Sequence, residues 1–171
     1  MLRVVPKVKE WERWIKAIDN VHKRATYYYK WVPRVWSVEF RNLLFENLNR
    51  QRFSYMYSPY NPGYAEWKMQ KVGHLDFWKL EGYVAIWLKS EKVASEPGKA
   101  AWFAGLGPEA MTAEGERVAE YATLMEQGGP LPNGKFMPSR PLFGPTHTEF
   151  IQNNSQVVMK KAWKGMKDQW K

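Results

Sequence analysis

Apolar residues along the N-terminal part of the chain recur in steps of three and four. They begin at Val8 and continue to Leu48, and this spacing places them on one face of a helix. Pro33 falls within the pattern, and an internal proline removes a backbone donor and crowds the preceding turn. The pattern therefore predicts two helices, or one bent helix, over about 7–30 and 33–50.

The middle of the chain changes to short apolar runs that are separated by turn residues. A loop is expected over 51–64, followed by a helical turn over 64–70. Two apolar runs, 83–88 and 99–106, flank a polar stretch that ends in the turn signal Pro97-Gly98. We predict that these two runs form an antiparallel pair of strands.

The last third of the chain contains two further helical segments and one short strand. A helix is predicted over 117–127, with Gly128 at its C-terminal end, and Phe136-Met137 is expected to add a third strand. The spacing of Thr146 and Glu149 matches a capping box, in which two side chains satisfy free amides at a helix start. The final helix that follows is predicted to pack its apolar positions on the sheet.

These elements predict an α+β fold in a single domain that spans residues 1–171. Its parts are long, kinked N-terminal helices, a small antiparallel sheet, and a C-terminal helix packed on the sheet. A chain of 171 residues is long enough to bury its own core. No apolar run approaches the length of a membrane span, and the charged N-terminus lacks the apolar core of a secretion signal. We therefore expect neither a membrane-bound nor a secreted protein.

Composition adds two candidate functions. The net charge is +9, and aromatic residues make up 16% of the chain. Basic side chains contact phosphates and rings stack on bases, so a basic nucleic-acid-binding module is one interpretation. Aromatic residues are also enriched in subunit interfaces, and we favour this second interpretation because the charge is not gathered into one run. The ends are basic and the middle is acidic, which suits either head-to-tail subunit contacts or neutralisation within one chain.

The residue types that usually carry catalysis or bind metals are scattered. His22, His74 and His147 show no metal-ligand spacing, and the chain has no cysteine. The sequence contains no phosphate-binding loop and no nucleophile elbow. Glu114 and Glu116 lie among small residues, where a solvated surface is expected. We therefore predict a protein that is not an enzyme and that uses no cofactor or metal.

Residues 118–150 form the segment whose composition is most constrained. Its prolines and glycines fix the path of the backbone, because proline sets φ and glycine allows left-handed turns. We interpret the segment as a structural connection that holds the sheet, a protruding loop and the last helix in one geometry. Its candidate structural and interface residues are Tyr121, Glu126, Gly128, Pro138, Arg140, Pro141 and Phe143.

This segment, taken with the loop before it, resembles the tail-completion, or virion-morphogenesis, proteins of long-tailed bacteriophages. The resemblance rests on a Tyr-Ala-x-x-x-Glu-x-Gly segment, an Arg-Pro turn and a C-terminal helix, and its order and spacing extend along most of the chain. The matching residues are Tyr57, Pro59, Tyr64, Leu80, Glu81, Gly82, Tyr121, Ala122, Glu126, Gly128, Pro138, Arg140, Pro141, Leu142 and Phe143.

The resemblance implies a non-enzymatic virion protein that is assembled in the host cytoplasm and located at the head–tail junction. Such a protein forms a homo-oligomeric ring, expected to be a hexamer, between connector or neck proteins and the tail tube. DNA passes through the ring and makes non-specific contacts. Tail completion, tail termination and another neck role all stay open. The 128–140 loop would contact a neighbouring subunit through Arg140, or else Arg140 would pair with Glu126 or a carbonyl inside its own subunit.

Overall fold

The computed structural model describes residues 8–78, 82–96, 99–131 and 133–168, and it has the predicted α+β character. Leu80, Glu81 and the turn signal Pro97-Gly98 lie outside the described residues. The helical elements are α1 (Val8–Asn49), the 3-10 turn η1 (Ser54–Met56), α2 (Pro62–Val72), α3 (Tyr83–Trp87), α4 (Val118–Gln127), α5 (Phe143–Glu149), the π-helical segment η2 (Phe150–Asn154) and α6 (Ser155–Asp168). The strands are β1 (Leu88–Glu96), β2 (Lys99–Leu106), β3 (Gly129–Pro130) and β4 (Phe136–Met137).

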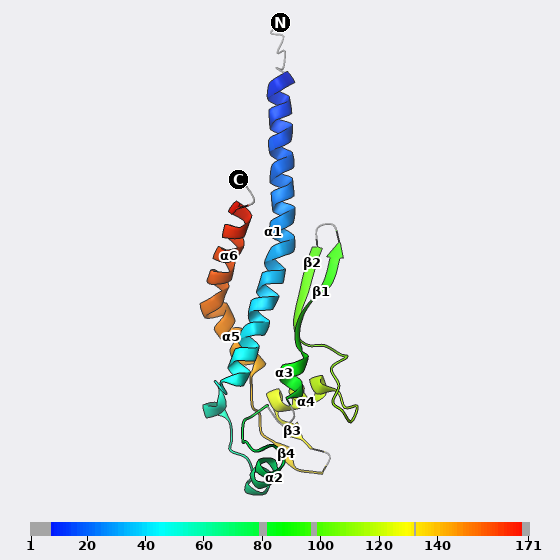
Figure 1. Ribbon diagram of the computed structural model, residues 1–171, viewed down its shortest axis with the longest axis vertical. Coiled ribbons are helices and arrows are strands. Elements are labelled where there is room, and N and C mark those ends of the chain that lie inside the picture. Colours follow the sequence, from blue (N-terminus) through cyan, green and yellow to red (C-terminus); the bar gives the residue numbers. More distant parts are fainter. Residues whose placement is uncertain (1–7, 79–81, 97–98, 132, 169–171) are drawn as a thin grey trace.

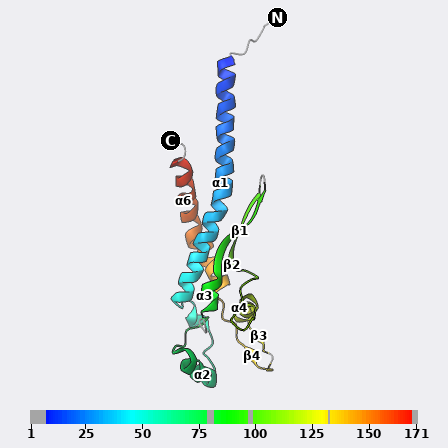
Figure 2. The same ribbon diagram turned by 45° about the vertical axis from the view of Figure 1, so that its right-hand side comes forward.

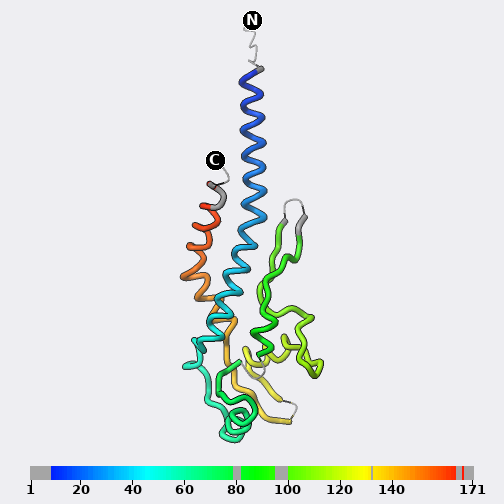
Figure 3. Tube along the Cα trace, in the orientation of Figure 1, coloured from blue at the N-terminus to red at the C-terminus, as the bar shows by residue number. Residues whose placement is uncertain are grey.

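Helix α1 is the longest element of the molecule. It runs as one helix of 42 residues through Pro33, so of the two predicted alternatives the single helix holds and the division into two helices does not occur. Figure 1 shows α6 on one side of α1 and the β1–β2 hairpin on the other. We attribute the continuity at Pro33 to this packing, which offsets the backbone hydrogen bond that proline removes. The N-terminal part of α1 extends beyond both neighbours (Figure 3).

The β1–β2 hairpin confirms the predicted antiparallel pair but corrects its first strand. Residues 83–87 form helix α3, and β1 begins at Leu88, which pairs with Leu106. Val84 and Leu88 are both buried, and their separation by four residues is the spacing of one helix face. An apolar run of this length cannot distinguish helix from strand by its period. The polar residues 89–96 form the strand instead, because strand pairing uses backbone groups.

The C-terminal helix α6 packs on α1 and not, as predicted, on the sheet. Val158 and Ala162 of α6 are buried, and the ring centroids of Tyr28 and Trp163 lie 6.4 Å apart. Helix α1 lies between α6 and the hairpin in both ribbon views (Figures 1 and 2). The physical reason is that α1 offers a longer apolar face than a two-stranded hairpin does. The segment before α6, η2, faces β2 across an apolar cleft.

The hydrophobic core lies at the C-terminal end of α1. There it connects α1 to α3, α4 and the turn before α5. Strands β3 and β4 form a sheet of their own beside this core. Phe136-Met137 is therefore a strand, as predicted, but it does not extend the hairpin. Among the described helices, none is both long and apolar enough to cross a membrane. The buried core residues are Leu44, Leu48, Phe53, Trp78, Val84, Leu88, Ala110, Val118, Ala122, Met125 and Leu142.

Candidate functional site

Helix α4 ends at Gly128, as predicted, and the chain there passes very close to a later segment. The Gly128 backbone has φ 73° and ψ 171°, and its N–H donates to the Leu124 carbonyl at 2.8 Å. The segment after β4 returns along this helix end: Ser139 Oγ donates to the Glu126 carbonyl at 2.7 Å, and the Arg140 N–H donates to the Met125 carbonyl at 2.7 Å. The end of α4 is thus bonded to the residues that lead into α5.

The Glu126 side chain caps the N-terminus of α5. Its Oε2 accepts from the backbone N–H groups of Leu142 and Phe143 at 2.7 and 3.0 Å, and its Oε1 accepts from Gly144 at 2.8 Å. The first N–H groups of a helix have no partner within the helix, and a carboxylate there is favoured by the positive end of the helix dipole. One side chain therefore fixes the start of α5 from a separate helix.

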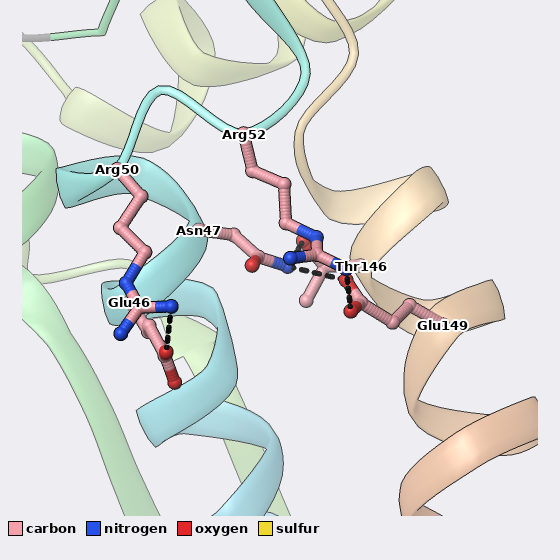
Figure 4. Close-up of polar contacts among 6 residues, drawn as sticks. All are labelled: Glu46, Asn47, Arg50, Arg52, Thr146 and Glu149. Atoms are coloured by element: carbon pink, nitrogen blue, oxygen red, sulfur yellow. Dashed lines mark hydrogen bonds and ion pairs between the residues drawn. The ribbon is translucent and has the colours of Figure 1, made fainter.

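The predicted capping box at Thr146 and Glu149 is wrong, because α5 already begins at Phe143. Thr146 is buried inside the helix, and its hydroxyl accepts from Asn47 Nδ2 of α1 at 3.1 Å. Glu149 accepts from the same Asn47 nitrogen at 2.9 Å and pairs with Arg52 at 2.8 Å (Figure 4). These two residues connect α5 to the end of α1 instead of capping their own helix.

Arg140 lies inside the subunit, against aromatic rings. Its side chain is 5% exposed, and its guanidinium carbon lies 4.6 Å from the ring centroid of Tyr60 and 5.1 Å from that of Phe77. Its carbonyl accepts from Trp78 Nε1 at 3.0 Å. Of the two alternatives for this residue, the structure places it within its own subunit, but on the two rings and not in a pair with Glu126.

The remaining candidate residues converge on the same place. Tyr57 Oη donates to the Pro141 carbonyl at 2.8 Å, and the Phe143 ring lies 5.8 Å from that of Trp78. Tyr121 is half-buried, and burial raises its pKa to about 12. Pro138 follows β4 directly. We name the whole group the motif cluster; its members are Tyr121, Glu126, Gly128, Pro138, Arg140, Pro141 and Phe143.

A buried lysine beside the motif cluster had no signal in the sequence. Lys68 of α2 is 1% exposed, and its Nζ donates to Tyr60 Oη at 3.0 Å and to the Asp76 carbonyl. Burial lowers the pKa of Lys68 to about 8, with Arg140 contributing in the same direction and Asp76 opposing it. A lysine in a polar helix is normally solvated, so only the tertiary structure identifies this one.

Substitution of Lys68 by methionine is expected to change how stability depends on pH. The folded-state pKa of Lys68, about 8, lies below the unfolded value of 10.5. Between these values the unfolded chain binds more protons, so Lys68 makes the wild-type free energy of unfolding rise with pH. The free energy of unfolding of Lys68→Met minus that of wild type is therefore expected to fall by about 2 kcal/mol between about pH 7.5 and about pH 9.5. Urea unfolding at the two pH values measures this.

That experiment stays below the pH at which the ionisation of tyrosines changes the stability. Burial raises the pKa of Tyr57 and of Tyr121 to about 12, so stability from these groups is lost above about pH 10, where unfolded tyrosines ionise. Lys135→Met, at an exposed position, is the matched control. Equal pH dependence in Lys68→Met, Lys135→Met and wild type would contradict the assignment.

Substitution of Arg140 by alanine is expected to destabilise the folded subunit by about 2 kcal/mol. The change removes a guanidinium from two aromatic rings and leaves a space between them. The loss is partly offset, because Arg140 Nε is buried with no hydrogen-bond partner among the described residues and because one charge near Lys68 disappears. Urea unfolding of the purified variant measures the effect. If the urea midpoint stayed unchanged and only assembly were impaired, Arg140 would have the interface role that the sequence suggested.

The structure brings together no obvious catalytic or metal-binding group in the described part of the chain. Within the described ranges, no three His, Cys, Asp or Glu side chains are placed to hold a metal ion. His22 is exposed on α1, His74 Nδ1 accepts from the Asp76 N–H at 3.3 Å, and His147 lies edge-on to Phe40. The cleft between α1, β2 and η2, about 450 Å³, has mainly apolar walls.

Compared with known proteins, the chain matches no protein-family model, no curated protein and no solved structure.

Proposed function

We propose that this protein is a structural component of the head–tail junction of a long-tailed bacteriophage. It assembles into a homo-oligomeric ring, a hexamer in our proposal, that joins connector or neck proteins to the tail tube and lets DNA pass. The observation that carries the proposal is the motif cluster. Tyr57, Glu126 and the run 141–143 are among the residues that resemble the tail-completion proteins; they lie far apart in sequence, yet they meet around one helix end and one helix start.

The motif cluster leaves the β3–β4 loop free to contact a neighbouring protein. The cluster fixes both ends of this loop, through the Gly128 turn and the Arg140–Met125 backbone bond. At its edge, Phe136 is 72% exposed, and β3 and β4 lie at the margin of the molecule (Figure 2). A loop that is held at both ends and flanked by an exposed aromatic residue suits a contact between subunits or between stacked rings, where aromatic side chains are enriched.

The proposal is tested in virions and with the purified chain. Mass spectrometry of purified particles should find the protein, and negative-stain microscopy of the isolated chain should show closed rings. Deletion of the gene should yield separate heads and tails. Absence of the protein from purified particles, or normal joining of heads and tails without it, would overturn the proposal.

A basic nucleic-acid-binding module is the second candidate, and one groove favours it. Lys160, Lys164 and Lys167 recur on one face of α6, beside the exposed Trp163 and against Tyr28 of α1. Lysines with aromatic rings are the combination that contacts phosphates and stacks on bases. This candidate predicts that binding of the isolated chain to DNA weakens steeply as salt concentration rises. Flat salt dependence, or binding unchanged by Lys160→Gln with Lys164→Gln, would exclude it.

A further inference from the structure

The N-terminal part of α1 carries large apolar side chains that the described part of its own chain leaves uncovered. Every side chain from Lys9 to Lys23 is exposed, and the N-terminal part of the helix stands clear of α6 and the hairpin (Figure 3). Single exposed apolar residues are common on proteins, but a continuous row of them marks an interaction surface. The exposed fractions are 59% for Trp11, 68% for Trp14, 63% for Ile15, 65% for Ile18 and 63% for Val21.

The spacing of this row is that of a helix that packs on other helices. Trp11, Ile15 and Ile18, followed by His22 and Ala25, advance in steps of four, three, four and three. The mean step of 3.5 residues is the coiled-coil repeat, which keeps one seam facing a partner helix.

The apolar face is wider than one seam. Trp14 and Val21 lie beside Ile18 on the same flank, at the positions that broaden the apolar stripe from a two-helix seam to the face of a bundle. We call this face, with its members Trp11, Trp14, Ile15, Ile18 and Val21, the α1 stripe.

Further along α1 the same face is covered by the chain itself. Tyr29 Oη accepts from the Ala100 N–H of β2 at 3.0 Å, and Val32 and Trp36 line a cleft with Trp102. On the other flank, Tyr28 lies against Trp163 of α6. The α1 stripe therefore continues an interface that already exists inside the subunit, beyond the point where the described elements of that subunit end.

Charge helps to identify what covers the stripe. Residues 9–23 hold Lys9, Arg13, Lys16 and Lys23 against Glu10, Glu12 and Asp19, so this part of the helix is nearly neutral. Asp19 and Lys23 already pair with each other at 2.7 Å. A helix that lies on an anionic membrane surface carries a strongly basic polar face. Near-neutral flanks instead allow identical helices to approach one another without strong repulsion.

We propose that the α1 stripe packs against the α1 stripes of further copies of this chain, in a parallel bundle of more than two helices. The inference rests on the proposed ring, because rotation about a ring axis brings identical helices together in the same direction. The polar positions Arg13 and Asn20, opposite the stripe, face away from the bundle. The bundle then supplies the contact that holds the copies in a closed ring, and because it lies on the ring axis it has to open before DNA passes.

Engineered cysteines test the arrangement directly, because the natural chain has none. Ile18→Cys is expected to form disulfide-linked dimers under mild oxidation, since equivalent seam positions face each other in a parallel bundle. Asn20→Cys, on the opposite face of the same helix turn, is expected to stay unlinked. Equal cross-linking of the two variants, or none at Ile18→Cys, would overturn the parallel bundle.

A double substitution tests whether the stripe is needed for assembly. Ile15→Ser with Ile18→Ser is expected to raise the dissociation constant of the oligomer by about 100-fold or more, and Arg13→Ser with Asn20→Ser should leave it unchanged. All four positions are exposed in the subunit, so the urea midpoints of dissociated subunits should match. Native mass spectrometry across a dilution series reports the oligomer. A wild-type monomer whose stripe binds anionic vesicles, or a double variant that assembles normally, would overturn the inference.

These results separate the inference from the proposed function. Assembly that depends on the stripe, in a protein absent from virions, would defeat the proposed function and leave the bundle intact. A virion ring that persists with Ile15→Ser and Ile18→Ser would defeat the bundle and leave the proposed function intact.

Discussion

Replacement of Glu126 by alanine is expected to lower the free energy of unfolding by about 3 kcal/mol. The carboxylate accepts three backbone N–H groups at the start of α5. Hydrogen bonds to a charged group contribute about 1.5–3 kcal/mol, and N-cap losses reach about 2 kcal/mol. The contributions do not add fully, because exposed amides such as that of Gly144 find water. Urea unfolding monitored by tryptophan fluorescence measures the change.

Two further substitutions make this test specific. Glu126→Gln keeps an acceptor oxygen but loses the charge, so its effect should fall about midway between wild type and Glu126→Ala. Glu120→Ala removes an exposed carboxylate from the same helix, where its pair with Arg117 spans 3.5 Å, and should cost less than about 0.5 kcal/mol. If Glu126→Ala and Glu120→Ala had the same effect, the capping role would be wrong.

The sequence predicted best where one local rule acts alone. The apolar steps along α1 and the Gly128 end of α4 follow from spacing and from glycine chemistry, and both are confirmed. The strand predicted over 83–88 was wrong because these residues suit helix and strand equally. The choice between the two depends on the core contacts of Val84 and Leu88. A helix start was misplaced at Thr146 because its cap, Glu126, comes from another helix.

The candidate site shows the same division between what is local and what is not. The resemblance selected Glu126, Gly128 and Arg140, and the structure brings all three into one cluster. It could not give their roles, since Arg140 contacts rings that lie far from it in sequence. Lys68 could not be identified either, because its burial depends on how Tyr60 and Asp76 fold around it. The members of the motif cluster are buried or half-buried, so we propose that contacts with other subunits fall elsewhere, on the α1 stripe and the β3–β4 loop.

We expect the most damaging small substitution in the motif cluster to be one that acts through the backbone. Gly128→Ala is expected to lower the free energy of unfolding by about 4 kcal/mol. The φ and ψ values of Gly128, 73° and 171°, lie in a region that is essentially restricted to glycine, at a cost of about 1–3 kcal/mol for other residues. An added Cβ would also lie 2.8 Å from the Met137 carbonyl oxygen and 2.8 Å from the Ser139 nitrogen. Both are backbone atoms, so the segment leading into α5 would have to move.

Gly134→Ala serves as a comparison. Gly134 has a similar φ of 75°, but an added Cβ there would meet no atom within 4 Å, so only the left-handed strain of about 1–2 kcal/mol applies. The difference between the two variants therefore reports the close approach of the α4 end to residues 137–139 together with any extra backbone strain at Gly128. Because that approach also positions Glu126 on α5, Gly128→Ala combined with Glu126→Ala should cost less than the sum of the single effects. Urea unfolding of the four proteins decides it, and strict additivity would show that the Gly128 turn and the Glu126 cap act independently.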